Sequence, residues 1–140
     1  MRFSRGRNFL LRVPEGKELL GFINEFARKN NVLIGTVSAI GSLKNPKIGY
    51  FDEDAGGYKV IELTGTYELV SLTGNISVKD GEPFAHIHVA LGDSDGMLYG
   101  GHLIEAEVFV AEVFMQELLG ELLERKPREN GLSLWDAVEL

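Results

Sequence analysis

The sequence contains no cysteine, and this absence excludes several kinds of chemistry at once. Disulfide bonds, thiolate metal sites and a cysteine nucleophile are all ruled out, and the composition is compatible with a reducing compartment. Proline occurs four times and tryptophan once in 140 residues, whereas 44% of residues are hydrophobic and 25% are charged. These proportions are ordinary for a globular chain, so we expect a single domain over residues 1–140.

Long apolar runs are also missing. No stretch approaches the ~20 apolar residues that a membrane-spanning helix needs, and the run VFVAEVFM is interrupted by Glu112. The first residues, MRFSRGRNFLLRV, lack the apolar centre and the cleavage site of a secretory signal peptide. We therefore expect a soluble, cytoplasmic protein.

Positive charge is scarce, since the formal net charge is −7. Four arginines nevertheless lie among the first 12 residues, which contain no acid, at positions Arg2, Arg5, Arg7 and Arg12. A protein that binds nucleic acid with its whole surface is normally basic. DNA binding by this chain would therefore need a local basic patch.

The pattern of apolar residues predicts mostly strands. About seven strands are expected, most of them joined as antiparallel hairpins, because β-rich segments are separated by Gly and Asp turn signals. The segments with this pattern are 8–13, 32–43, 47–51, 58–63, 66–72, 75–78, 84–92, 97–103 and 104–115. The predicted fold class is α+β, built on a mainly antiparallel sheet.

Two segments favour helix. Leu19, Ile23 and Ala27 recur at helical spacing, which predicts one helix that opens near Pro14 and stops near Asn30. A second, short helix is expected near the C-terminus. It is indicated by four leucines at helical spacing, at positions 118, 119, 122 and 123.

All three histidines lie within 17 residues, in the segment HIHVALGDSDGMLYGGH (86–102). In an extended strand His86 and His88 project from the same face, with Cβ atoms about 7 Å apart. The turn DSDG then sends the chain back along this strand. Three imidazoles on neighbouring strands are a candidate metal site.

The position of the third histidine depends on strand register. Pairing Gly92 with Met97 places His102 opposite Ile87, one position away from the face that carries the other two histidines. A one-residue bulge at the pair Gly100-Gly101 would correct this offset.

Three neutral imidazoles at His86, His88 and His102 suit Zn²⁺, Cu²⁺, Ni²⁺ or Fe²⁺, and zinc is expected in the absence of thiolates. Water, or a carboxylate from a neighbouring chain, could fill the fourth position. The alternative is that these are ordinary hydrogen-bonded strand residues, because an H-x-H pattern alone is a weak signal. We interpret Asp93 and Asp95 as turn formers and not as ligands.

Three segments resemble a known family: GEPFAHIHVALGDSDGMLYGGHLIEAEV (81–108), LTGTYELVSLTGNIS (63–77) and VSAIGSLKNPKIGYFD (37–52). On these motifs the chain resembles the plants-and-prokaryotes-conserved domain, called PPC, from Arg12 to about Met115. The resemblance implies a compact α+β protein that assembles as a homotrimer. It also implies a DNA-associated, regulatory role, since plant members carry the domain behind an AT-hook and prokaryotic members are often labelled DNA-binding.

The same resemblance implies metal ligands at His86, His88 and His102, because some family members hold a metal at the corresponding H-x-H…G-G-H histidines. One motif departs from the family. The segment Arg5-Gly6-Arg7-Asn8 lacks the proline of the AT-hook core Arg-Gly-Arg-Pro and runs directly into a predicted strand. We interpret it as a polar strand edge.

Three functions remain open. The first is a trimeric binding module with a regulatory or DNA-associated role. The second is a metal-dependent hydrolase or lyase acting on a small polar substrate, with Glu82, Glu105 or Glu107 as general base or as a partner of an imidazole N–H. No phosphate loop or dinucleotide fingerprint is present, so no substrate class follows.

The third function is structural, with metal ions near the subunit contacts of a trimer. A carboxylate from a partner chain would then complete each site. Apolar residues of the last long strand could be buried between subunits or belong to the core of one chain; they are Phe109, Val110, Val113 and Phe114.

Overall fold

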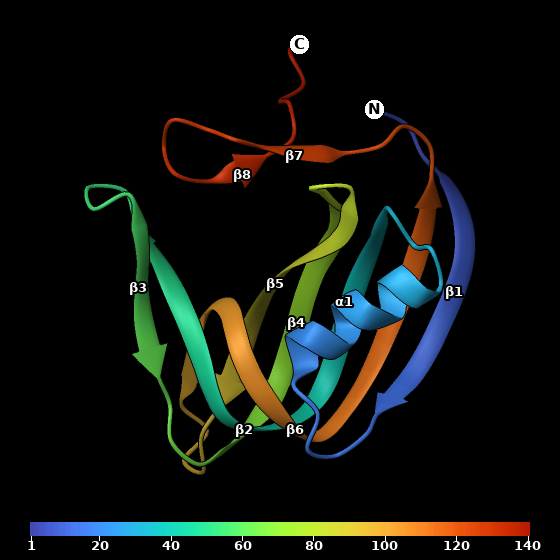
Figure 1. Cartoon of the computed structure of the whole chain (residues 1–140). Helices are drawn as coiled ribbons and strands as arrows, with labels where there is room; N and C mark the ends of the chain where they lie inside the picture. The colour runs from blue at the N-terminus through green and yellow to red at the C-terminus, as the bar shows by residue number, and fades with distance from the viewer.

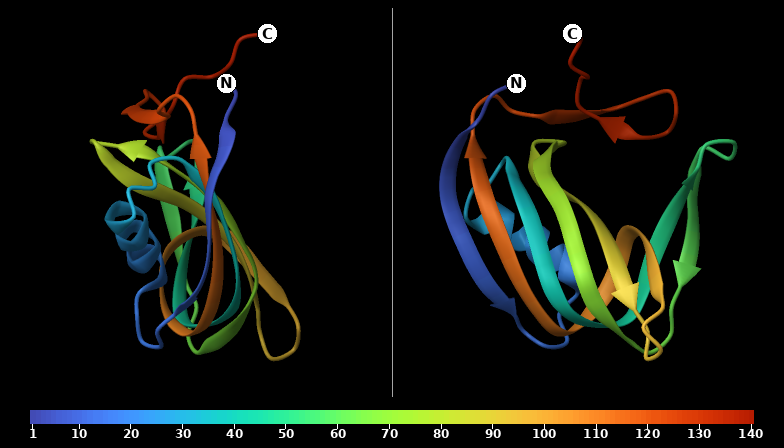
Figure 2. Two further views of the ribbon diagram at one scale, coloured as in Figure 1. Left: turned by 90° about the vertical axis from the view of Figure 1, so that its right-hand side faces the viewer. Right: turned by 180° about the vertical axis from the view of Figure 1, so that it is seen from behind.

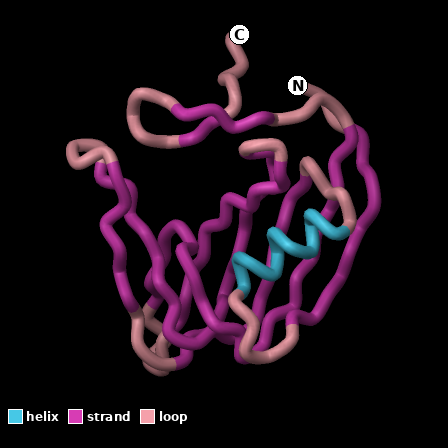
Figure 3. The backbone as a smooth tube through the Cα atoms, viewed as in Figure 1, coloured by secondary structure: helices cyan, strands magenta, loops and turns pink.

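The computed structural model describes all 140 residues, Met1–Leu140. It contains one helix and eight strands, and most of the backbone is strand (Figure 3). In chain order the elements are β1 (Ser4–Val13), α1 (Leu19–Lys29), β2 (Gly35–Asp52), β3 (Gly57–Glu62), β4 (Thr66–Lys79), β5 (Glu82–Gly92), β6 (Leu98–Leu119), β7 (Glu124–Pro127) and β8 (Ser133–Leu134). The predicted α+β class with a mainly antiparallel sheet is confirmed (Figure 1).

Four strands close on themselves. β2 pairs with both β4 and β6, and β5 also pairs with both β4 and β6, all in antiparallel fashion. Closure requires β2 and β6 to bend, and bulges interrupt their ladders, one of them next to Gly41. A Cβ at Gly41 would lie 2.0 Å from the carbonyl oxygen of Val110, so only glycine allows these two backbones to approach.

The enclosed side of the sheet forms the hydrophobic core. Because side chains alternate along a strand, Ile87 and Leu91 of β5 point inward and have no exposed surface. α1 packs against β5 and β6, where β5 extends beyond its pairing with β6, and its inward residue Ile23 is fully buried. The helix lies against one side of the strands (Figure 2).

Local contacts fix both the start and the docking of α1. Its predicted opening near Pro14 is slightly too early: the helix begins at Leu19, and the Glu18 carboxylate accepts the N–H groups of Leu20 and Gly21. The Asn24 side-chain oxygen accepts the backbone N–H of Ala85 at 2.8 Å, which ties the helix to β5. α1 is the only helix, and it is neither long nor apolar enough to cross a membrane.

The predicted C-terminal helix is wrong. β6 continues to Leu119, because the backbone at Leu118 pairs with Arg5 of β1 and its N–H bonds to the carbonyl of Ile34. Strand partners thus satisfy the polar groups that a helix would have satisfied internally. The chain then crosses the end of the sheet as the hairpin β7–β8 (Figure 1), and β7 pairs in parallel with the end of β4.

Candidate metal centre

His86 and His88 project from the outward face of β5. The residue between them, Ile87, is buried in the core, so alternation places both imidazoles on the opposite side of the strand. Their Nε2 atoms are 3.2 Å apart. The sequence-based expectation that these two side chains project from the same face of the strand is confirmed.

His102 reaches the same place through the register of the β5–β6 hairpin. His88 pairs directly with His102 and Gly92 pairs with Leu98, with no bulge between these pairs. The predicted register was therefore wrong by one residue, and the expected bulge at the glycine pair 100–101 is absent. The offset is absorbed by the turn, which includes Met97 and is thus one residue longer than DSDG.

Asp93 explains the length of this turn. Its Oδ1 atom accepts the backbone N–H groups of both Asp95 and Met97, and Gly96 has a φ angle of +78°. The interpretation of Asp93 as a turn former is confirmed. Because the Asp93 side chain bonds to the N–H of Met97, Met97 belongs to the turn, and His102 therefore pairs with His88.

The three histidines form one compact group. One ring nitrogen from each of His86, His88 and His102 lies within 4.8 Å of the others, and the ring centroids are 5.1, 5.2 and 5.8 Å apart. Nδ1 of His102 is buried and has no hydrogen-bond partner, although buried nitrogens are normally satisfied. A cation shared among the rings would satisfy such a nitrogen, so the residues present fit a metal ion.

The electrostatics of the group favour neutral imidazoles. Burial lowers the pKa of His86 to about 4, and the positive charges of Arg125 and of the other two histidines act in the same direction. Burial, followed by the charge of His88, also lowers the pKa of His102. Both rings are therefore unprotonated at neutral pH, which is the form that binds metal.

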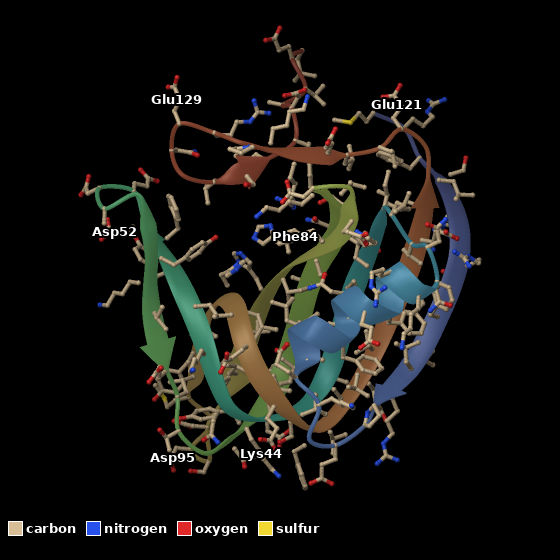
Figure 4. The ribbon with its side chains drawn as sticks, viewed as in Figure 1. Lys44, Asp52, Phe84, Asp95, Glu121 and Glu129 are labelled. Carbon is tan, nitrogen blue, oxygen red and sulfur yellow. The ribbon has the colours of Figure 1, made fainter.

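The histidines open into a pocket of about 480 Å³. Its walls come from β5 and β6, from the end of β4, from the β2–β3 hairpin and from the C-terminal hairpin. The lining residues are Gly49, Tyr50, Phe51, Tyr58, Lys79, Phe84, His86, His88, Gly101, His102, Arg125, Gly131, Leu132, Ser133 and Leu134. Phe84 lies below the β7–β8 hairpin, on the strand that carries two of the histidines (Figure 4).

Two parts of this pocket were not predicted from the sequence. Tyr58 of β3 stacks on the His102 ring at 4.6 Å, and Arg125 of β7 reaches the pocket from the tail. No local motif marks either residue, because both are brought to the histidines by the folding of distant segments.

The acids that were considered as catalytic helpers lie elsewhere. Glu105 forms an ion pair with Lys47 at 3.0 Å, and Glu107 lies 3.9 Å from Lys44. Glu82 is exposed at the turn between β4 and β5. No aspartate or glutamate lines the histidine pocket.

The N-terminal arginine motif also has a structural explanation. Arg7 donates from Nε and Nη2 to the two carboxylate oxygens of Glu117, each at 2.8 Å, and its backbone N–H donates to the same group. These hydrogen bonds lower the pKa of Glu117 to about 2. A Cβ at Gly6 would lie 2.7 Å from this carboxylate, so Arg-Gly-Arg provides an arginine and the space beside it.

The fold and the site define a class: single-domain proteins with a closed, mainly antiparallel sheet and three histidines on adjacent strands. Residues 2–119 match the model of the Plants and Prokaryotes Conserved (PCC) domain, and the chain belongs to this family. The family assignment agrees with the resemblance drawn from the sequence motifs.

Solved structures support the assignment. A plant- and prokaryote-conserved protein from Pyrococcus horikoshii is 57% identical, with a TM-score of 0.98 over 99% of this chain and 97% of its own. A metal-containing protein from Archaeoglobus fulgidus is 46% identical, with a TM-score of 0.92 and 97% of each chain covered. A protein from Bacteroides thetaiotaomicron described as a DNA-binding candidate is 25% identical, with a TM-score of 0.86 over 96% of each chain.

One curated relative is much longer. The bifunctional protein GlmU from Synechococcus is 29% identical over 124 residues, which is 86% of this chain. The matched region is 19% of the relative, so this chain spans about a fifth of its length.

Proposed function

We propose that this protein binds one divalent metal ion, with Zn²⁺ as the expected ion, through His86, His88 and His102. The observation that carries the proposal is the convergence of three ring nitrogens, one from each histidine, within 4.8 Å of one another. The His102 ring also has a buried Nδ1 atom without a hydrogen-bond partner. Three neutral imidazoles are a common ligand set for zinc. The 46% identical relative described as metal-containing supports the same role.

The rest of the pocket holds these ligands in place. Tyr58 packs flat against His102, and the backbone pairing of His88 with His102 fixes the spacing of their rings. Three protein ligands leave a fourth position open toward the pocket, where a bound zinc ion would act as a Lewis acid. We favour a binding module over a hydrolase or lyase, because no carboxylate in the pocket is placed to act as a general base.

The proposal includes assembly as a homotrimer. Seen from behind, β1, β6, β2 and β4 lie side by side with no helix over them (Figure 2). Four exposed apolar side chains from these strands line one surface hollow: Leu10 is 82% exposed, Ile40 58%, Val70 51% and Phe114 41%. A second copy of the same chain is the occupant we propose, because such a face is costly in water. Val113, considered earlier for an interface, is instead fully buried in the core.

DNA binding is the weaker candidate, favoured by the name of the 25% identical relative. Arg7 is already paired with Glu117, and the net charge is −7. Titration of the protein with duplex DNA at two salt concentrations tests this function. Binding that weakens with added salt would support it, whereas absence of binding at ~50 mM salt would exclude it for this chain.

Metal analysis tests the main proposal. Protein purified without chelator and then titrated with Zn²⁺ is expected to hold one ion per chain, and His88→Ala is expected to lose at least about nine-tenths of the zinc affinity. Thr73→Ala is the matched control, since Thr73 is exposed and pairs with His88 from β4. Full zinc occupancy in His88→Ala would refute the ligand assignment.

The same preparations distinguish a structural metal from a functional one. Sedimentation of the metal-free protein as an intact trimer would support an open, functional site. Dissociation on metal removal would instead assign the ion a role in assembly.

A further inference from the structure

Arg125 is a buried cation with no anionic partner. The residue is 6% exposed. No carboxylate oxygen lies within 4.0 Å of its guanidinium nitrogens, so it forms no ion pair. Buried charges in proteins are normally paired, because removing them from water is costly. An unpaired guanidinium in a pocket is therefore an observation that points to a missing anion.

The known contacts of Arg125 do not use all of its donors. Nε donates to Ser77 Oγ at 2.7 Å, Nη1 to the carbonyl of Ser133 at 3.0 Å and Nη2 to Asn75 Oδ1 at 3.0 Å. A guanidinium has five N–H groups, so two remain. Asn75 pairs with His86 across β4 and β5, which places the guanidinium beside the histidine group.

Lys79 adds a second cation to the same pocket. Its ammonium lies 5.0 Å from the centre of the Phe84 ring and forms no ion pair. The protein has 21 acidic residues, but none of them lines this pocket. Arg125 and Lys79 therefore give the pocket positive charge that no acidic side chain neutralises, although the protein as a whole is acidic. This charge favours an anionic ligand in the pocket.

The remaining walls suit an apolar body. Tyr50, Phe51, Tyr58 and Phe84 line the pocket, and its volume of about 480 Å³ lies in the range of small-molecule sites. An inorganic ion would leave these aromatic surfaces unused. A carboxylate attached to an apolar group would use both the cations and the rings.

We propose that the pocket binds a small organic carboxylate, with its charged group between the histidines and the two cations Arg125 and Lys79, and its apolar part against the aromatic wall. This inference rests on the proposed function for the metal ion, which would add positive charge at the same place. The contribution of Arg125 and Lys79 does not require the metal. The C-terminal hairpin, which carries Arg125, thereby becomes part of the ligand site.

Trp135 provides a direct measurement. It is the only tryptophan, and its ring centre lies 4.6 Å from the Arg125 guanidinium carbon. Its fluorescence is followed during titration with benzoate, with benzamide of similar shape but no charge, and with inorganic phosphate. Titrations are made on zinc-loaded and on metal-free protein, with the zinc content measured separately.

Lys79→Gln is the test variant, because loss of Arg125 would also release the tail. Lys59→Gln is the matched control: Lys59 lies on β3, is exposed, and does not line the pocket. Benzoate is expected to bind at least about tenfold more tightly than benzamide, as charge-assisted hydrogen bonds imply. Lys79→Gln should weaken benzoate binding by about threefold or more, and Lys59→Gln should not.

Three results would overturn the inference: no benzoate binding to either form of the protein, equal binding of benzoate and benzamide, or equal effects of the two lysine variants. Phosphate binding as tight as that of benzoate would overturn the assignment to organic carboxylates. If the wild-type protein binds benzoate but does not bind zinc, only the metal proposal is contradicted. Zinc binding without any benzoate binding would contradict this inference alone.

Discussion

His88 and His102 face each other across β5 and β6 as a directly paired set, and Gly101 forms the next pair with Val89. The same stretch of β6 pairs on its other side with β2, where Gly49 lies opposite His102. His102 is thus held between two strands. The geometry of the candidate metal centre therefore depends on how closely β2, β6 and β5 approach one another.

Gly101→Ala is expected to disturb the centre without touching a ligand. A Cβ at this position would lie 2.7 Å from the carbonyl oxygen of Gly49, so β2 and β6 must separate. We expect the free energy of unfolding to fall by about 1–3 kcal/mol, as in overpacked sites, and zinc affinity to fall with it. Gly57→Ala is the control, because nothing lies within 4 Å of its added Cβ. Equal behaviour of the two variants in denaturant titrations and zinc titrations would contradict this explanation.

Glu117→Gln is expected to destabilise the protein in a pH-dependent way. The Glu117 side chain is 10% exposed and accepts three hydrogen bonds from Arg7, so its loss at pH 7 should cost about 1–3 kcal/mol. Because the pKa of Glu117 is lowered from 4.5 to about 2 in the folded protein, the stabilisation is complete above pH 4.5. It is lost as the pH falls from 4.5 through 2.

Urea unfolding of wild type and Glu117→Gln at pH 7, 5, 3.5 and 2.5 measures this dependence. The difference in unfolding free energy should shrink toward the lowest pH. Glu25→Gln is the control, because its pair with Lys29 is exposed and its removal should leave stability almost unchanged. A difference that stays constant across this range would show that the charge of Glu117 is not the cause.

Leu10→Glu is expected to abolish the proposed trimer. Leu10 is 82% exposed in the single chain, so the substitution should leave the fold intact and act only on the contact between copies. Wild type should sediment as a trimer and the variant as a monomer at the same concentration. Met97→Glu, at another apolar position that is 62% exposed and lies in a turn, should remain trimeric. A monomeric wild type, or a trimeric Leu10→Glu, would rule out this face as the interface.

Ser77→Ala is expected to loosen the C-terminal hairpin. Ser77 is fully buried and its Oγ accepts the Nε–H of Arg125 at 2.7 Å, so the variant leaves a buried charged donor without a partner. We expect a loss of about 1–3 kcal/mol in unfolding free energy. Trp135 emission should shift to longer wavelength at a lower urea concentration than in wild type. Ser38→Ala, on an exposed position of β2, should leave the Trp135 transition unchanged.

Much of the fold could be predicted from local patterns. Alternation in the segment of β5 predicted that His86 and His88 lie on the same face of the strand, because strand geometry has a strict period of two. The structure shows which face this is, since Ile87 between them is buried in the core. The helix followed from the spacing of Leu19 and Ile23 in the same way. The predicted helix near Leu118 failed because helical spacing of leucines is only a preference, and pairing with β1 overrode it.

The sequence by itself determined the fold class, the family motifs and the set of three histidines, since these depend on short-range periodicity and on residue identity. Only the tertiary structure decided the register that places His102 opposite His88, because register depends on the hydrogen bonds of the Asp93 turn. It also decided that Arg125 enters the pocket and that Glu105 does not. Those placements arise from closure of the sheet and docking of the tail, which bring together residues that no local pattern connects.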